Sequence, residues 1–275
     1  MAGFLTEMAK SALTRVTEAK TRVSEADLWA RAQESPLPPQ LKLSEAGFDV
    51  IAELKLNSPA QGKLGAPSDD IEARVVQYAE GGAAAVSVLT EPTRFDGSME
   101  HLERSALALA HHGVPAMRKD FLFDPYQVVE ARVAGAGGVL VILRMIDRRR
   151  IIELLDCAAM LKLFVLLEGF DEVDLALGGE IIAERKGHAE KLLLGVNARN
   201  LDTLQVVPDR LKELAPKLAA GVPHVAESGV GTPEDAAELA RAGYQMALIG
   251  TALMSTGSPR ALLAEMLKAA RGANA

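Results

Sequence analysis

The sequence predicts an α/β protein folded as a (β/α)8 barrel, or TIM barrel, with an N-terminal helical extension. Eight short apolar runs alternate with helix-like segments, and most runs end in a group able to do chemistry. In such barrels the loops after the strands build the active site, while the opposite rim serves stability. The predicted strands are Phe48–Leu54, Ala84–Leu89, Val114–Met117, Val139–Leu143, Leu163–Leu167, Leu192–Val196, Val222–Val225 and Met246–Ile249.

Helical patterns fill the intervals between these runs. Several begin with Asp-Pro or Thr-Pro, which supplies an N-cap and a proline at the first helical position. Glycines such as Gly135 and Gly243 stand where helices end. The predicted helices are Ser68–Glu80, Ser98–His112, Pro125–Ala134, Asp147–Leu161, Asp171–Arg185, Pro208–Ala219, Pro233–Ala242 and Pro259–Ala270.

A doubly wound open sheet is the alternative architecture. It would require a glycine-rich fingerprint after the first strand, but that strand runs into Glu53-Leu54-Lys55. Eight strand–helix pairs without a second break in composition predict one domain over residues 1–275. A barrel of this kind often needs about 250 residues.

Residues 1–45 precede the first strand and form the extension. Leu5, Met8, Ala12 and Val16 recur at helical spacing, and a proline-rich stretch at residues 35–39 stops any helix. The extension could cap the barrel floor or approach the active-site rim. Because the apolar stripe is too narrow for a core helix, we expect it near the rim.

Composition excludes several classes. A net charge of −7 and a pI near 5.4 argue against nucleic-acid binding, and leave open a local basic pocket for an anionic small molecule. The single cysteine, Cys157, lies in a helical pattern and is interpreted as a core residue. No leader segment or bilayer-length apolar run is present, so we expect a cytoplasmic protein without membrane contact, monomeric or weakly homo-oligomeric.

Charged residues at strand ends form the candidate catalytic group. Side chains alternate along a strand, so Glu53 and Lys55 share one face at the barrel mouth. Lys119 follows the third strand and also points inward. Glu168 closes the fifth strand, where an apolar run followed by a carboxylate suits a general acid. Structural ion pairs among these groups are the alternative interpretation.

The last three strands carry the residues of a predicted anion site. Asn197 and Arg199 present an amide and a guanidinium, and glycines in the final loops allow backbone N–H groups to approach a phosphate. Barrels frequently bind phosphate after strands seven and eight. The candidate phosphate-binding residues are Lys55, Ser228, Gly229, Gly250 and Thr251. The scattered histidines form no convincing metal site, and no cofactor is expected.

The chain resembles the indole-3-glycerol phosphate synthase family from about residue 35 to residue 268. The order and spacing of its motifs carry this resemblance: Ile51-Ala-Glu-Leu-Lys55 with Ser58-Pro59, Ser87-Val-Leu-Thr-Glu91 with Phe95-Asp-Gly-Ser98, Arg118-Lys-Asp-Phe121 with Asp124-Pro-Tyr-Gln127, Asn197-Ala-Arg-Asn-Leu201, Ala226-Glu-Ser-Gly229 and Gly250-Thr-Ala-Leu-Met254.

This resemblance implies a lyase of tryptophan biosynthesis that acts on 1-(2-carboxyphenylamino)-1-deoxyribulose 5-phosphate. Ring closure, decarboxylation and loss of water would give indole-3-glycerol phosphate without a cofactor. By analogy, Lys119 is the general acid at the ketone, Glu168 assists proton transfer, and Glu53 and Asn197 position the reacting groups. Lys55 meets the anionic groups of the substrate. The implied substrate-binding residues are Ser58, Leu89, Phe95, Phe121 and Arg199.

Some positions depart from the family pattern. They are Leu56-Asn57, Ala60, Arg94 and Gly169-Phe170. They allow a paralogue that serves a specialised indole pathway. An isomerase resembling phosphoribosylanthranilate isomerase would need a cysteine or aspartate acid/base pair, which the strand ends do not offer. A non-catalytic barrel would be expected to lose charges that are costly to cluster.

Overall fold

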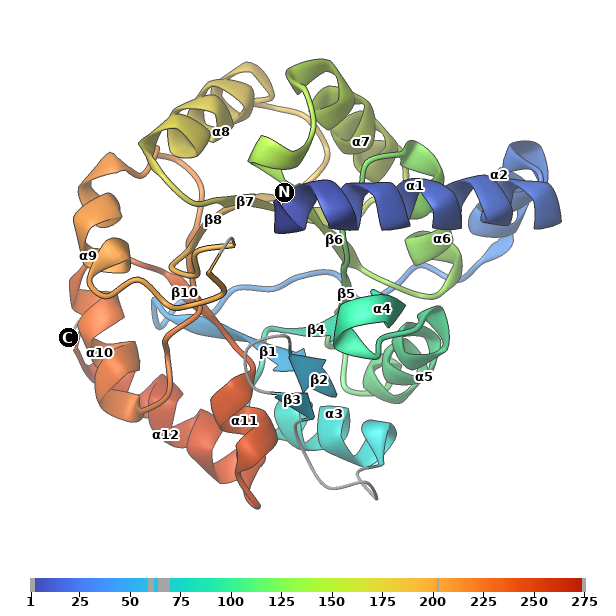
Figure 1. The fold of residues 1–275 in the computed structure, drawn as a ribbon. Coiled ribbons are helices and arrows are strands. Elements are labelled where there is room, and N and C mark those ends of the chain that lie inside the picture. Colours follow the sequence, from blue (N-terminus) through green and yellow to red (C-terminus); the bar gives the residue numbers. More distant parts are fainter. Residues whose placement is uncertain (1–2, 59–61, 64–69, 202, 274–275) are drawn as a thin grey trace.

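The computed structural model describes residues 3–58, 62–63, 70–201 and 203–273. Eight parallel strands close into a barrel in the order β1-β10-β9-β8-β7-β6-β5-β4 (Figure 1). Closure is complete because β1 pairs with both β4 and β10. The strands are β1 (Asp49–Leu54), β4 (Ala85–Leu89), β5 (Ala116–Lys119), β6 (Gly138–Ile142), β7 (Phe164–Gly169), β8 (Leu192–Asn197), β9 (His224–Glu227) and β10 (Met246–Ile249).

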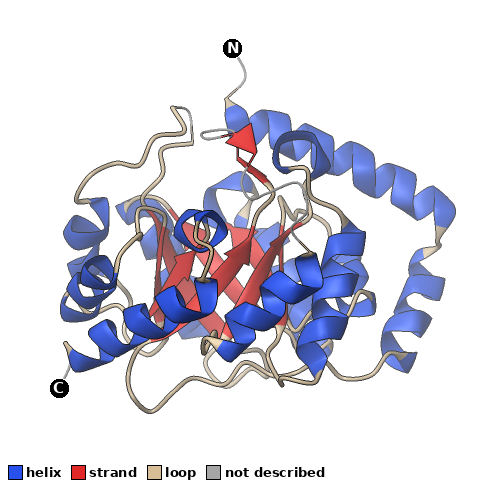
Figure 2. Ribbon diagram, turned by 90° about the horizontal axis from the view of Figure 1, so that it is seen from below, coloured by secondary structure: helices blue, strands red, loops and turns tan. Residues whose placement is uncertain are grey.

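Helices surround the barrel (Figures 1 and 2). The outer helices are α3 (Ile71–Glu80), α5 (Met99–Ala110), α6 (Pro125–Val133), α7 (Arg148–Met160), α8 (Glu172–Glu184), α9 (Arg210–Leu214), α10 (Pro233–Arg241) and α12 (Pro259–Gly272). Short elements add to them: α4 (Pro92–Phe95), the 3-10 turns η1 (Leu143–Met145) and η2 (Ala215–Lys217), α11 (Thr251–Ser255) and the hairpin β2 (Asn57–Ser58) and β3 (Gly62–Lys63). Polar N-caps start many helices; Asp124 and Thr232, for example, complete capping boxes ahead of Pro125 and Pro233.

The apolar residues divide into two cores because strand side chains alternate between faces. One core fills the barrel, with Ile51, Met117, Leu166 and Leu248 among its members. The other lies between the strands and the outer helices and is the larger. Cys157 belongs to this second core, where burial raises the pKa of its thiol to about 12, so its prediction as a core residue is confirmed.

The predicted (β/α)8 barrel is confirmed, with corrections at the boundaries. The strands β5, β7, β8 and β9 continue past their apolar runs and include the polar residues that follow. The predicted helix Pro208–Ala219 is wrong as one element, because it divides into α9 and η2. Pro216 lacks an N–H and blocks the preceding turn. The predicted start of α3 at Ser68 lies outside the described residues, and Asp70 caps that helix.

The extension contains two helices, α1 (Phe4–Arg22) and α2 (Glu25–Glu34), rather than the one that was expected. Figure 2 shows α1 lying across the end of the barrel that also carries the β2–β3 hairpin. Met8 and Ala12 of α1 are buried against the core of the barrel interior. The expected placement at the active-site rim is therefore confirmed. Within the described part of the chain, no helix is both long and apolar enough to cross a bilayer.

Gly138 provides a test of packing inside the barrel. A Cβ at this position would lie 2.4 Å from the ring of Phe164 on the neighbouring strand. We predict that Gly138→Ala destabilises the protein by about 1–3 kcal/mol, the usual cost of overpacking a core. Urea unfolding monitored by circular dichroism measures this loss. Gly257→Ala is the matched control, because a Cβ there meets no atom within 4 Å. Equal stability of the two variants would contradict this account of the interior.

Candidate active site

A cavity opens at the carboxyl ends of the strands, and almost every predicted site residue lines it. Its predicted members are Glu53, Lys55, Leu89, Phe95, Lys119, Phe121, Glu168, Asn197, Arg199, Ser228, Gly229, Gly250 and Thr251. Ser58 lies in β2, but the structure does not describe its side chain. Further lining residues that were not predicted are Phe4, Asp120, Leu140, Ile142, Leu201, Leu204, Glu227, Val230 and Leu248.

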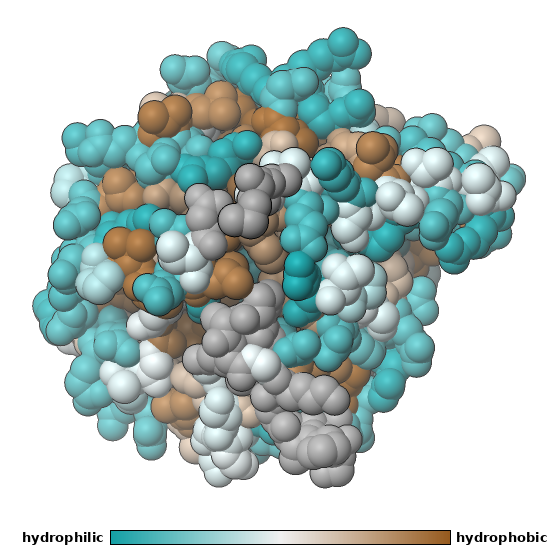
Figure 3. Space-filling view, in the orientation of Figure 1, coloured by the Kyte–Doolittle hydropathy of each residue, from teal (hydrophilic) through white to brown (hydrophobic). Residues whose placement is uncertain are grey.

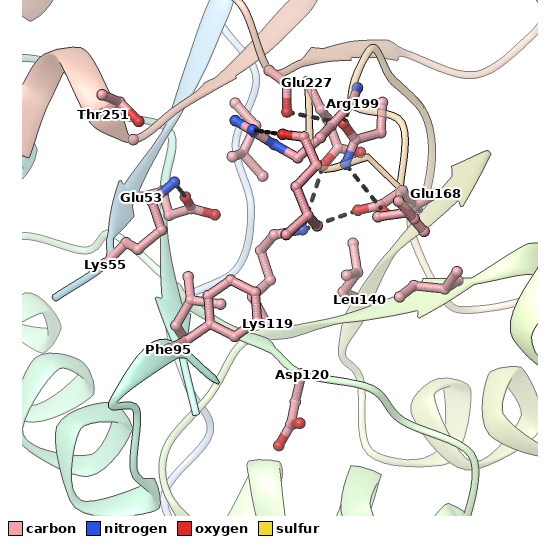
Figure 4. Close-up of a pocket in the computed structure, with 18 of the residues that line it drawn as sticks. Glu53, Lys55, Phe95, Lys119, Asp120, Leu140, Glu168, Arg199, Glu227 and Thr251 are labelled. Carbon is pink, nitrogen blue, oxygen red and sulfur yellow. Dashed lines mark hydrogen bonds and ion pairs between the residues drawn. The ribbon is translucent and has the colours of Figure 1, made fainter. Parts of the chain in front are cut away.

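Lys119 stands at the centre of the charged groups (Figure 4). Its Nζ donates to Glu168 Oε2 at 2.9 Å and lies 3.6 Å from Glu227 Oε2. Burial alone would lower the pKa of the ammonium, but the neighbouring glutamates, Glu168 first, outweigh this effect and raise that pKa. Lys119 therefore remains protonated at neutral pH, as a proton donor must be.

Glu53 and Lys55 form the second ion pair, at the end of β1. Lys55 Nζ lies 2.9 Å from Glu53 Oε1, and both side chains are largely buried. Burial would raise the pKa of Glu53, but the neighbouring Lys55 and Lys119 hold it below its usual value. Gly250, directly after β10, makes room for this carboxylate, because a Cβ there would lie 2.5 Å from Glu53 Oε1.

Asn197 links Glu168, in the charged group, to the loops after β8 and β9. Its amide Nδ2 donates to Glu168 Oε1 at 3.3 Å. Its Oδ1 accepts hydrogen bonds from Ser228 Oγ and from the Arg199 backbone N–H, both at 2.9 Å. The guanidinium of Arg199 is held in turn by the carbonyl of Leu204 at 2.6 Å. The side chain of Asn197 thus fixes the orientation of Glu168 relative to the anion-binding loops.

Glu227, at the end of β9, is the functional residue that the sequence analysis missed. Its side chain is buried beside Lys119 and has no hydrogen-bond donor among the described residues. Burial first, and then the charge of nearby Glu168, raises the pKa of Glu227 well above its ordinary value. Strand alternation gives the missing signal, since Glu227 shares a face with Val225 in the barrel interior.

The two sides of the cavity differ in chemistry. Apolar side chains form one wall: the rings of Phe4 and Phe95 lie 5.9 and 6.3 Å from that of Phe121. Opposite them are the loops after β8, β9 and β10. Ser228 and Gly229 both adopt left-handed backbone conformations there, with φ of 69° and 82°. The cavity can therefore take a molecule with an aromatic end and an anionic end.

Several of the residues that depart from the family pattern make contacts outside the charged group. Leu56 packs against the outer core, and Arg94 forms an ion pair with Glu7 of α1. Phe170 is buried under the guanidinium of Arg144, 4.8 Å from the ring centroid. Asn57 lies in β2, and Ala60 lies outside the described residues. No group of three or more His, Cys, Asp or Glu residues in the described ranges could hold a metal ion.

Glu227 generates a pH-dependent prediction. A carboxyl whose pKa is raised by folding keeps its proton in the native state after the unfolded state has lost it. Stability therefore falls as pH rises from about 4.5 toward the native pKa. We predict that Glu227→Gln removes this loss, so that its stability relative to wild type increases with pH, while Lys119 keeps its contact with Glu168.

Urea unfolding at a series of pH values measures the effect. Exposed Glu265→Gln on α12 is the control and should show no such trend. A Glu227→Gln variant that loses stability relative to wild type as pH rises would mean that Glu227 is ionised in the folded protein.

Comparison with known proteins identifies the family. The family model for indole-3-glycerol phosphate synthase matches residues 5–266. The indole-3-glycerol phosphate synthase of Mycobacterium leprae (strain Br4923) is 38% identical over 253 residues, 92% of this chain and 88% of that protein. That of Parafrankia sp. (strain EAN1pec) is 42% identical over 220 residues, 80% and 78% of the two chains.

Among solved structures, 3-hexulose-6-phosphate synthase from Salmonella typhimurium has a TM-score of 0.62 at 13% identity, covering 82% of this chain and all of its own. At that identity the likeness shows the barrel fold alone. The match of the family model along nearly the whole chain and the curated relatives do not favour the isomerase or another alternative. The chain belongs to the indole-3-glycerol phosphate synthase family.

Proposed function

We propose that this chain converts 1-(2-carboxyphenylamino)-1-deoxyribulose 5-phosphate to indole-3-glycerol phosphate, carbon dioxide and water, as a decarboxylating lyase. The observation that carries the proposal is the buried, protonated Lys119 between an aromatic wall and an anion-binding rim. A substrate with a carboxyphenyl ring at one end and a phosphate at the other spans such a cavity.

The proposed chemistry begins at the ketone of the substrate. The ring carbon that bears the carboxylate attacks the ketone carbon while Lys119 donates a proton to the ketone oxygen. The carboxylate then leaves as carbon dioxide, which restores the aromatic ring. Loss of the new hydroxyl group as water completes the indole, and Glu168 assists the proton transfer. The hydrogen bonds of Glu168 with both Lys119 and Asn197 support this role.

The remaining residues bind and orient the substrate. Leu89, Phe95 and Phe121 contact the aromatic ring, and Glu53 and Asn197 hold Lys55 and Glu168 in place. Lys55 faces the substrate's anionic groups. Ser58, in the β2–β3 hairpin, is proposed to contact the substrate. The phosphate binds at the loops after β9 and β10, with Arg199 at that end, through Ser228, Gly229, Gly250 and Thr251.

The surface supports a monomer or a weak homo-oligomer. Figure 3 shows hydrophobic residues between hydrophilic ones on the face that carries the cavity. The exposed large hydrophobic side chains in the described ranges lie on separate elements: Leu13, Leu37, Leu107, Met160, Val173 and Val206. Stable homodimers usually bury a more continuous apolar surface.

The catalytic role of Lys119 is tested by turnover. We predict that Lys119→Ala lowers kcat by at least about 10²-fold, the lower end of the contribution of general acid catalysis. Lys119→Arg should restore little, because a guanidinium is a poor proton donor. Fluorescence of the indole product follows the reaction. Substrate should still bind, since Leu89, Phe95 and the phosphate-binding loops lie on other elements. Near-normal turnover of Lys119→Ala with weaker binding would make this lysine an anion-holding group instead.

The phosphate position is tested at Thr251. Gly250 is unsuitable, because any side chain there also displaces Glu53. We predict that Thr251→Glu raises KM at least about tenfold through charge repulsion, and that inorganic phosphate inhibits the wild type competitively. Ser255→Glu, at the exposed end of α11, adds the same charge and should leave KM unchanged. If Thr251→Glu behaved like Ser255→Glu and phosphate did not inhibit, the anion would bind elsewhere.

A further inference from the structure

Asp120 follows Lys119 in sequence but lies on the opposite face of the strand end. Figure 4 shows the Lys119 side chain among the charged groups of the cavity and the Asp120 carboxylate pointing away from them. The Asp120 side chain is fully buried. Its neighbours therefore determine where the backbone that carries both Lys119 and Phe121 is held.

Donors occupy both oxygens of the Asp120 carboxylate. Arg15 of α1 binds it with two parallel hydrogen bonds of 2.8 Å, one to each oxygen. The other donors are Thr90 Oγ1 at 2.8 Å, Arg118 Nη2 at 3.1 Å and the backbone N–H of Phe121 at 2.8 Å. Burial would raise the pKa of Asp120, but the Arg15 and Arg118 guanidiniums hold it far below its usual range. The carboxylate is therefore ionised at neutral pH.

Packing alone does not fix the side chains that donate to this carboxylate. A cavity of about 290 Å³ lies beside the network and is lined by Arg15, Thr90, Arg118 and Gln127. Side chains next to such a space are free to shift unless hydrogen bonds restrain them. The bidentate contact from Arg15 restrains the angle of the carboxylate as well as its distance.

Helix α1 is itself fixed to the loops after β4 and β5. Near its start, Phe4 contacts the ring of Phe121 edge-on, and Glu7 pairs with Arg94. Near its end, Tyr126 Oη donates to the carbonyls of Ala19 and Val23 at 3.2 and 2.9 Å. Arg15 lies between these anchors. It therefore connects a helix outside the barrel to the residue next to Lys119.

We propose that Arg15 is a positioning residue that holds Lys119 in its reactive place through Asp120. The inference rests on the proposed role of Lys119 as the general acid. Arg15 touches neither Lys119 nor the cavity that would hold the substrate. Its loss should let the strand end shift, and a displacement near 1 Å at a reacting group costs on the order of 10²-fold in rate.

The test compares substitutions on one helix. Arg15→Met keeps the length of the side chain but removes its guanidinium, and we expect kcat to fall at least about tenfold while KM changes less than about threefold. Arg15→Lys should recover only part of the lost kcat, because its ammonium keeps the charge but lacks the fork that binds both carboxylate oxygens. Lys20→Met, on the same helix as Arg15, is the control. It removes an exposed ion pair with Asp124 and should leave both kcat and KM unchanged.

Each outcome separates the alternatives. A wild type without activity on the carboxyphenylamino-deoxyribulose phosphate would overturn the proposed function. An active wild type with Arg15→Met equal to Lys20→Met would overturn only the positioning role. A lower Tm with normal kcat per folded enzyme would also overturn it, because Arg15 would then be structural. A rise confined to KM would assign Arg15 to the aromatic wall through Phe121.

A second variant applies if Arg15→Met does not fold. Thr90→Val removes another donor to Asp120 from the loop after β4, without changing α1. A fall in kcat with little change in KM would support control of Lys119 by the Asp120 network. Unchanged kcat would overturn it.

Discussion

The ammonium of Lys119 sits among three buried carboxylates, and the rest of the site follows from keeping that group stable. Removing one ion from water costs on the order of several kcal/mol, which close and well-directed partners must offset. Glu168 supplies the hydrogen bond, the charge of Glu53 adds attraction, and Asn197 keeps Glu168 correctly oriented. Each of these groups comes from a different strand, so only the closed barrel brings them together.

Small residues make this concentration of charge compatible with a packed interior. Gly250 leaves space for Glu53, and Gly195 on β8 does the same for Glu227, since a Cβ there would lie 2.2 Å from Glu227 Oε1. Lower in the barrel, Gly138 accepts the ring of Phe164 in the same way. In each of these layers of the interior, a glycine on one side leaves room for a large side chain from the neighbouring strand. The layers continue up to the charged groups of the cavity.

Local sequence patterns predicted the strands and the charged and anion-binding residues of the cavity, because apolar runs and alternation are properties of adjacent residues. The resemblance to the family, and no local pattern, implied Leu89, Phe95 and Phe121. The same alternation, counted from Val225, places Glu227 in the barrel interior. Glu227 was not predicted because it directly precedes Ser228 and Gly229, which were interpreted as a phosphate-binding loop. The strand ends were set too early because the runs were bounded by their apolar residues. The contact between Arg15 and Asp120 spans 105 residues, and no local pattern in the sequence encodes it. The division of the expected helix after Leu214 depended on one proline, Pro216.

The acids and the base of the site belong to strands, whereas α1 and the turns after β1 and β4 only border them. This separates two kinds of evolutionary change. A strand residue such as Glu53 is tied to the glycine that faces it, so the pair must be inherited together. The rim is under a looser constraint, because Arg94 there pairs with the half-exposed Glu7 of α1. New substrate ranges in such a lineage would therefore arise at the border of the cavity, while the reaction itself is passed on with the barrel.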